Sequence, residues 1–407
     1  MKLYPHQVEV LEETKNINKV AYFMDMGLWL GKTFVSSEKA NSYNNKILVV
    51  SQLSKVKDWC EHFKKYYDYE VYDLTNKNNI QTFINLNYKC VAVINYDVVW
   101  RRKELLKLED FTLILDESSL INNETTKRAK FILKLKPTNT ILLSGSLCGG
   151  KYERLYSQLQ LLGWNISKKM YYSQYIDMQI SEDGYPIIKG YKNVDRLKRK
   201  IREHGAIFMK TEEVLDLPSQ NFITINVNSS KEYKHFMKNG IVEVNGVELV
   251  GDTTLTKLLY ARELCGLYSD EKLKVFKDLV DSTDDRLIVF YNFKQELEKM
   301  VELIDKPHSI VNGSVKDLTN YENYDNSITF IQYQSGSMGL NLQKANKIIY
   351  FTPTLSSEMF EQSKKRIHRL GQKESCFYYK LECGIEYKIY NTLSMRKDFT
   401  DKLFEED

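Results

Sequence analysis

A short glycine-bearing segment places a lysine and a threonine where they could bind a nucleoside triphosphate. The apolar run Val20–Met24 leads into Gly27 and then Gly31-Lys32-Thr33. A strand, a glycine loop, Gly-Lys-Thr and then a helix is the arrangement that binds phosphates. Free N–H groups at the start of the helix and the Lys32 ammonium would hold phosphate oxygens, and the Thr33 hydroxyl would bind Mg²⁺. We therefore expect ATP and Mg²⁺ here, with Gly27, Gly31, Lys32 and Thr33 as binding residues; the alternative is a helix start with an incidental lysine.

This loop departs from the regular spacing. Met26 stands where the pattern G-x-x-x-x-G-K-[ST] has its first glycine, and Trp29 brings a bulky side chain to a place where the backbone approaches phosphate. Removing Trp29 and Leu30 would leave the more regular sequence Asp-Met-Gly-Leu-Gly-Lys-Thr. The departure keeps open a second hypothesis, a nucleotide-gated nucleic-acid-binding protein with weak or no hydrolysis.

A pair of carboxylates follows another apolar run. Leu113–Leu115 leads directly into Asp116 and Glu117. At the end of a buried strand, the aspartate would complete the Mg²⁺ shell and the glutamate would orient the attacking water. Acidic pairs are common on protein surfaces. This pair indicates a nucleotide site only because a phosphate loop precedes it in the sequence. Ser144-Gly145-Ser146 ends a further run and is expected at the same sheet edge, where ligands bind in open α/β sheets.

Two arginines near the C-terminus would supply positive charge to a phosphoryl group. Arg366 and Arg369 are three residues apart, so in a helix they would share one face. A planar guanidinium suits the spread charge of a phosphoryl transition state. The alternative is a basic helix that only faces solvent.

The elements that must position these residues form two groups of short apolar runs. Such runs, rich in Val, Ile and Phe and separated by amphipathic stretches, predict parallel strands buried on both faces. The first group is Val20–Met24, Ile47–Val50, Val91–Ile94, Leu113–Leu115 and Ile141–Leu143; the second is Leu287–Tyr291, Ser309–Val311, Ile328–Gln332, Ile348–Phe351 and Phe377–Lys380.

The pattern predicts an α/β fold with two parallel-sheet lobes and a mainly helical insertion between them. We expect a first lobe at residues 1–150, a middle region at 151–281 and a second lobe at 282–407. Within the middle region, Asn245-Gly246 predicts a tight turn between two short strands.

Composition narrows the class of protein. The chain has 407 residues, a net charge of +4 and six scattered cysteines without a C-x-x-C pair, which disfavours a zinc knuckle or a disulfide framework. No apolar run approaches the ~20 residues of a membrane span, and the N-terminus lacks a signal peptide, so we expect a cytoplasmic protein. The mild charge means that any nucleic-acid site must come from local clustering.

The order of the motifs resembles that of the superfamily-two helicases, specifically the Swi/Snf-like ATPases and their compact phage-encoded relatives. The matching segments are Leu3–Gln7, Ile47–Val50 with Trp59, Asn95-Tyr96, Asp116–Ser119, Ser144–Ser146, Ser335–Leu342 and Gln362–Gln372. The resemblance implies two RecA-like lobes and ATP-dependent movement on DNA, in the cytoplasm of a bacterial host if the chain is phage-encoded. It also implies that Gln7 reads adenine, that Gly339 and Gln362 bind nucleotide, and that Arg366 and Arg369 reach the ATP of the other lobe.

The resemblance further implies contacts with nucleic acid, with duplex DNA as the favoured track. Candidate contacts are Lys127, Arg128, Ser335 and Asn341, which lie in loops like those the family uses for the phosphate backbone. The basic helix of Leu197–Lys200 and Arg202 is a weaker candidate, because charge runs are usually solvated faces. A strand-separating helicase and an RNA helicase stay open as alternatives; the arginine segment argues against a kinase or transporter ATPase. A monomer is favoured.

Overall fold

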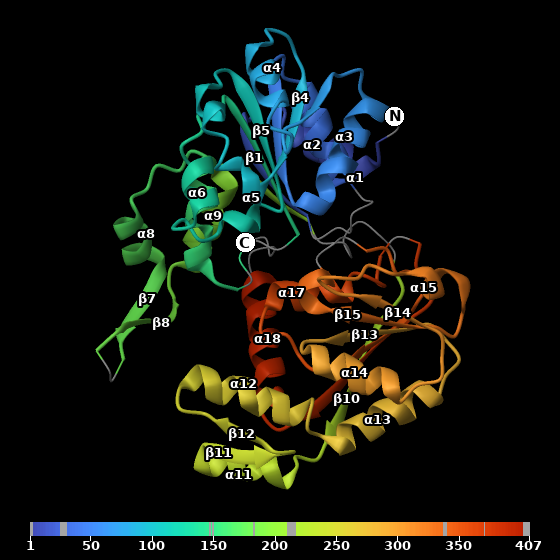
Figure 1. Cartoon of the computed structure of the whole chain (residues 1–407). Coiled ribbons are helices and arrows are strands. Elements are labelled where there is room, and N and C mark those ends of the chain that lie inside the picture. The colour runs from blue at the N-terminus through green and yellow to red at the C-terminus, as the bar shows by residue number, and fades with distance from the viewer. Residues whose placement is uncertain are drawn as a thin grey trace. The chain divides into compact units, whose positions relative to one another are not determined.

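The computed structural model of the chain describes residues 3–24, 31–145, 148, 150–181, 184–209, 217–336, 340–369 and 371–401. The chain divides into two compact units, Met1–Val214 with Asp398–Asp407, and Leu215–Lys397 (Figure 1). The boundary between the units falls within the predicted middle region. None of the described helices is long and apolar enough to cross a membrane.

The first unit is built on a seven-stranded parallel sheet with the order β3-β4-β2-β5-β6-β1-β9. Its strands are β1 (Lys19–Met24), β2 (Lys46–Ser51), β3 (Val71–Asp73), β4 (Val91–Asn95), β5 (Phe111–Asp116), β6 (Asn139–Ser144) and β9 (Ala206–Met209). All five strands predicted for this lobe are confirmed. Their apolar runs are buried on both faces, which explains why they lack the alternation of a half-exposed strand.

Helices cover both faces of this sheet (Figure 1). They are α1 (Pro5–Glu13), α2 (Lys32–Asn41), α3 (Leu53–Tyr66), α4 (Asn79–Asn85), α5 (Tyr96–Val99), α6 (Lys127–Ile132), α7 (Tyr156–Leu161), α8 (Lys168–Tyr175) and α9 (Val194–Glu203), with 3-10 turns η1 (Lys103–Lys107), η2 (Ser118–Ile121) and η3 (Tyr152–Leu155). A separate antiparallel hairpin, β7 (Ile176–Ile180) and β8 (Pro186–Tyr191), follows α8.

The second unit has a six-stranded parallel sheet with the order β10-β17-β16-β13-β15-β14. Its strands are β10 (Gln220–Val227), β13 (Leu287–Tyr291), β14 (His308–Val311), β15 (Ile328–Gln332), β16 (Lys347–Tyr350) and β17 (Cys376–Cys383). The five predicted strands are confirmed, and the sequence analysis missed β10. The helices are α11 (Lys231–Asn239), α12 (Thr254–Cys265), α13 (Asp270–Asp281), α14 (Lys294–Glu302), α15 (Thr319–Asn323), α16 (Tyr333–Gly336), α17 (Ser357–Lys364) and α18 (Glu386–Asp401).

The predicted fold class, α/β with two parallel-sheet lobes, is confirmed. The predicted middle region contains strands as well as helices: β9 extends the first sheet beside β1, and β10 extends the second beside β17. The predicted tight turn is also present, since β11 (Ile241–Val244) and β12 (Val247–Val250) pair across Asn245 and Gly246, both with positive φ.

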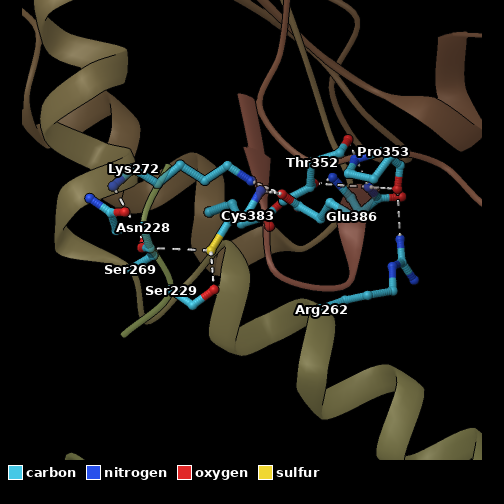
Figure 2. A network of polar contacts seen from close by, with 11 residues as sticks. Asn228, Ser229, Arg262, Ser269, Lys272, Thr352, Pro353, Cys383 and Glu386 are labelled. Atoms are coloured by element: carbon cyan, nitrogen blue, oxygen red, sulfur yellow. Dashed lines mark hydrogen bonds and ion pairs between the residues drawn. The ribbon is translucent and has the colours of Figure 1, made fainter. Parts of the chain in front are cut away.

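A buried polar network ties the second unit together (Figure 2). Lys272 of α13 and Glu386 of α18 form a fully buried ion pair, and the same Glu386 oxygen accepts the backbone N–H of Cys383 at 2.9 Å. Arg262 of α12 donates to the carbonyl of Pro353 at 3.0 Å. Because a buried charge without a partner is costly, these bonds fix how α12, α13 and α18 pack on the sheet.

Candidate functional site

The predicted phosphate and carboxylate residues lie at one edge of the first sheet. Strand β6 pairs with β1 on one side and with β5 on the other, all in parallel. Their carboxyl ends therefore meet, and they carry the connection to α2, the Asp116-Glu117 pair and Ser144-Gly145. This is the edge at which open α/β sheets bind ligands.

Helix α2 begins at Lys32, directly after Gly31. Gly31 has a φ of 126°, and a β-carbon there would overlap the side-chain amide of Gln7, so a larger residue would be strained and would displace Gln7. The Lys32 ammonium lies close to Gly145, because a β-carbon on Gly145 would be 3.3 Å from Nζ. Gln7, Gly31 and Lys32 are thus neighbours, as a nucleotide site requires. Gly27, Met26, Trp29 and Leu30 lie outside the described residues.

Asp116 is the last residue of β5, and the indole of Trp59 holds its carboxylate. Trp59 Nε1 donates to Oδ2 of Asp116 at 2.8 Å. Burial raises the pKa of Asp116, while the Trp59 bond and the charge of Lys32 oppose this increase. A carboxylate with this environment suits a bound cation. The described residues contain no cluster of three His, Cys, Asp or Glu side chains that could hold a metal alone. The assignment of Asp116 and Thr33 to Mg²⁺ that also binds nucleotide phosphates stays a prediction.

Glu117 occupies a strained turn directly after β5. Its backbone is left-handed, with a φ of 61°, which is uncommon for a residue other than glycine and costs on the order of 1–3 kcal/mol. One carboxylate oxygen, Oε1, accepts the hydroxyls of Ser144 at 2.9 Å and Ser119 at 3.1 Å. These bonds aim the carboxylate at the end of β6. This role of the two serines was not predicted from the sequence, although both lie in predicted motif segments.

The predicted nucleic-acid residues of this unit lie at the start of α6. The exposed Lys127 places its ammonium 4.8 Å from the ring centre of Trp100, and Arg128 forms an ion pair with Asp97 at 3.7 Å. Trp100 also stacks with Arg101 at 5.1 Å. Two cations on one aromatic ring form a small basic surface, and Trp100 was not predicted from the sequence as part of it.

The predicted placement of Arg366 and Arg369 on a helix is wrong. Helix α17 ends at Lys364, so both arginines lie in the turns that follow. The backbone N–H of Arg366 donates to the carbonyl of Ser363 at 3.2 Å, and the hydroxyl of Tyr378 donates to the carbonyl of Lys364 at 3.2 Å. These bonds tighten and cap the last turn, so the helix does not continue.

The turns nevertheless bury both arginines, and hydrogen bonds connect each of them to the segment at residues 340–342. Arg369 donates from Nη1 to the carbonyl of Leu340 at 3.3 Å, and the carbonyl of Arg366 accepts from the N–H of Leu342 at 3.1 Å. Burial lowers the pKa of Arg369 to about 10. Its Nη2 has no hydrogen-bond partner among the described residues, so it remains available for an anion.

Of the remaining predicted residues of the second unit, Ser335, Gly339 and Asn341 are in or near the same segment in sequence, and Gln362 precedes the two arginines. Gln362 is half-buried on α17, and Asn341 is exposed. Ser335 belongs to α16, but its side chain lies outside the described part of the chain, as does Gly339. The structure thus joins the two arginines to residues 340–342, which the sequence alone did not do.

Two family models match the chain in succession. Residues 14–269 match the SNF2-related domain, and residues 271–371 match the helicase conserved C-terminal domain. Together they cover most of the strands and every predicted site residue except Gln7. The resemblance to the Swi/Snf-like ATPases is confirmed, while the phage origin stays a prediction.

Individual relatives agree with these models. The chain is 23% identical to the DNA repair and recombination protein RAD26 of Saccharomyces cerevisiae, over 74% of this chain and 32% of that protein. It is 22% identical to a putative ATP-dependent helicase/translocase, YwqA, of Bacillus subtilis, over 75% of this chain and 37% of that one. It thus spans about a third of these relatives' length. A Sulfolobus solfataricus SWI2/SNF2 ATPase core in complex with dsDNA aligns with a TM-score of 0.47 and 18% identity, covering 98% of this chain and 92% of that chain. With more than half of its residues matched by one model, the chain belongs to the SNF2-related family.

Proposed function

We propose that this protein hydrolyses ATP in response to duplex DNA and uses the reaction to move along the duplex. The observation that carries the proposal is the edge of the first sheet, where Lys32, Asp116 and Glu117 lie together in a chain of the SNF2-related family. The names of similar proteins refer to DNA repair and recombination and to translocation, which favours DNA over RNA.

Each residue of the edge has a distinct role in this proposal. Lys32 neutralises the β and γ phosphates, and Gln7, which touches Gly31, contacts the adenine. Asp116 and Thr33 would hold Mg²⁺, which would shield the charge of the phosphates. Glu117 orients the attacking water through Oε2, because its Oε1 is occupied by Ser144 and Ser119.

The second unit completes the reaction in this proposal. Arg366 and Arg369 stabilise the phosphoryl transition state, Gln362 and Gly339 contact the nucleotide, and closing and reopening of the two lobes drives stepping. The available Nη2 of Arg369 supports an anion-binding role.

Nucleic acid would be held through its phosphates. Lys127 and Arg128 are the contacts in the first unit, and Ser335 and Asn341 those in the second. Such contacts give affinity without sequence preference, as a moving enzyme needs.

The test is ATP hydrolysis with and without duplex DNA, for the wild type, Glu117→Gln and the matched control Glu109→Gln, an exposed carboxylate of the same unit. We expect DNA to raise the wild-type and control rates. Glu117→Gln should lower the rate by about 10²- to 10⁴-fold and keep ATP binding, because it removes the group that orients water. A wild-type rate that DNA does not change would contradict the proposal. Triplex displacement beside fork unwinding then distinguishes translocation from strand separation.

The alternative of a nucleotide-gated binding protein rests on Trp29 and Leu30. It predicts ATP-dependent DNA binding without DNA-stimulated hydrolysis in the chain as it stands. The same assay decides between the two.

A further inference from the structure

The buried face of α3 carries two side chains that form hydrogen bonds with neighbouring elements of the candidate ATP site. Trp59 and His62 are three residues apart in this helix, so they share that face. Both are buried, and their rings meet edge to face with centroids 6.0 Å apart. Trp59 donates to the carboxylate of Asp116 at the end of β5. His62 forms its bond in another direction, toward α2.

His62 bonds to the helix that begins at Lys32. Helices α2 and α3 are neighbours in the first unit (Figure 1), and Nε2 of His62 lies 3.0 Å from the hydroxyl oxygen of Ser37. The Ser37 hydroxyl donates its one proton to the carbonyl of Thr33 at 2.7 Å. Its oxygen is therefore left to accept, and His62 must donate from a protonated Nε2. These two bonds join His62 to the first turns of α2.

The surroundings of His62 keep its imidazole neutral and fix its direction. Burial lowers the pKa of His62 to about 4, so the ring carries no charge at neutral pH and has a single N–H donor. The ring centroid lies 4.8 Å from that of Phe34 and 5.2 Å from that of Tyr66. Because aromatic rings of both helices contact the imidazole, its one donor is directed at Ser37.

One turn of α3 thus connects two elements of the site. Trp59 holds Asp116 at the end of β5, and His62 holds Ser37 in the first turns of α2. In the proposed reaction, Lys32 at the start of α2 and Asp116 act on the same nucleotide. A misplacement of about 1 Å at such a site can cost about 100-fold in rate. A link that sets the position of α2 relative to β5 therefore bears on turnover.

We propose that His62 is a positioning residue for ATP hydrolysis, which fixes the start of α2 through its bond to Ser37. Together with Trp59, it sets how far Lys32 lies from Asp116. The inference deepens the proposed function and rests on it, because it names a residue that serves the same reaction. The competing explanation is that His62 only packs α3 against α2, as its aromatic neighbours do.

The experiment compares His62→Leu, which loses the donor, with His62→Gln, which keeps an N–H donor on a side chain of similar reach. The matched control is Tyr67→Phe. Tyr67 directly follows α3, and its hydroxyl donates to Oε1 of Glu38 in α2 at 2.7 Å. The control therefore removes another hydrogen bond between the same two elements and keeps the aromatic ring.

The first readout is kcat and KM for ATP in the presence of duplex DNA. We expect His62→Leu to lower kcat about ten- to hundredfold with a smaller change in KM, because the separation of Lys32 and Asp116 matters most in the transition state. His62→Gln and Tyr67→Phe should stay within about threefold of the wild type, since each keeps the donor that Ser37 accepts.

A double-mutant cycle tests whether the effect passes through Ser37. Ser37→Ala should lower kcat by a similar factor, and adding His62→Leu should cost little more, because both changes break the same bond. Additive losses would overturn the inference. A loss in Tyr67→Phe as large as that in His62→Leu, or no rescue by His62→Gln, would also overturn it. If His62→Leu does not fold, Ser37→Ala against Tyr67→Phe decides by the same criteria.

Hydrogen exchange at the start of α2 gives a readout that does not depend on hydrolysis. Backbone amides of residues 32–37 should exchange about fivefold faster in His62→Leu than in the wild type, and at the wild-type rate in Tyr67→Phe. If DNA stimulates wild-type hydrolysis but His62→Leu changes neither exchange nor kcat, the inference is wrong and the proposed function stands. If DNA never stimulates hydrolysis but exchange rises in His62→Leu alone, the proposed function is wrong and the positioning of α2 by His62 stands.

Discussion

Replacing Trp59 by phenylalanine should weaken hydrolysis through one hydrogen bond. Trp59 is buried, stacks on Phe63 at 5.9 Å and donates to Asp116 at 2.8 Å, so phenylalanine keeps most of the packing and loses the donor. A hydrogen bond to a charged group contributes roughly 1.5–3 kcal/mol. If Asp116 must be placed and ionised in the transition state, turnover should fall about ten- to hundredfold, since ~1.4 kcal/mol corresponds to tenfold.

The pH profile provides a readout that a general loss of stability would not move. The Trp59 bond opposes the increase in the pKa of Asp116 that burial causes, so its loss raises that pKa further. The acid limb of DNA-stimulated hydrolysis should therefore move to higher pH. The assay is steady-state hydrolysis across pH at saturating ATP and DNA. The control is Trp164→Phe, whose ring packs on Tyr171 and Tyr175 in the same unit.

One result would refute this reasoning. If Trp59→Phe folds with a normal thermal transition and shows the wild-type rate and the wild-type acid limb, the indole does not position Asp116. If Trp59→Phe loses only as much rate as Trp164→Phe does and its acid limb does not move, Trp59 contributes packing alone.

Three further changes test other parts of the structure. Arg366→Ala or Arg369→Lys should lower the rate of ATP hydrolysis at least about 100-fold while ATP binding is retained, because each change removes a planar guanidinium from the transition state. If single-turnover assays show unchanged rates, lobe closure is disproved. Deleting Trp29 and Leu30 should leave or raise DNA-stimulated hydrolysis; activity only in the shortened form would mean that the natural loop is disabled. Burial raises the pKa of Glu296 from 4.5 to about 7. Between these two pH values the folded protein keeps a proton on Glu296 that the unfolded chain has lost. The free energy of unfolding therefore falls as the pH rises from about 4.5 to about 7. Urea unfolding of Glu296→Gln should show this loss removed, a change on the order of 3 kcal/mol relative to the wild type between pH 4 and pH 8.

The sequence predicted the sheets because their signal is local. A run such as Ile47–Val50 is buried on both faces wherever it lies, so composition alone marks it as a strand. The two-residue turn at Asn245-Gly246 was predicted for a similar reason, since both residues tolerate the positive φ that the turn requires. By contrast, β9 and β10 were missed, because each becomes a strand through pairing with a distant partner, β1 and β17 respectively.

For the site, the sequence by itself determined which residue types are present and at which strand ends they stand, namely Lys32, Asp116 and Glu117. Only the tertiary structure decided how they are held. The Trp59 bond to Asp116 spans 57 positions of the chain, and the Ser144 bond to Glu117 spans 27. The spacing of residues in a motif describes only positions that are close along the chain, whereas these contacts depend on the order of strands in the sheet. The same limit explains why the arginines were placed on a helix: the bonds that end α17 at Lys364 include one from Tyr378, on the adjacent strand.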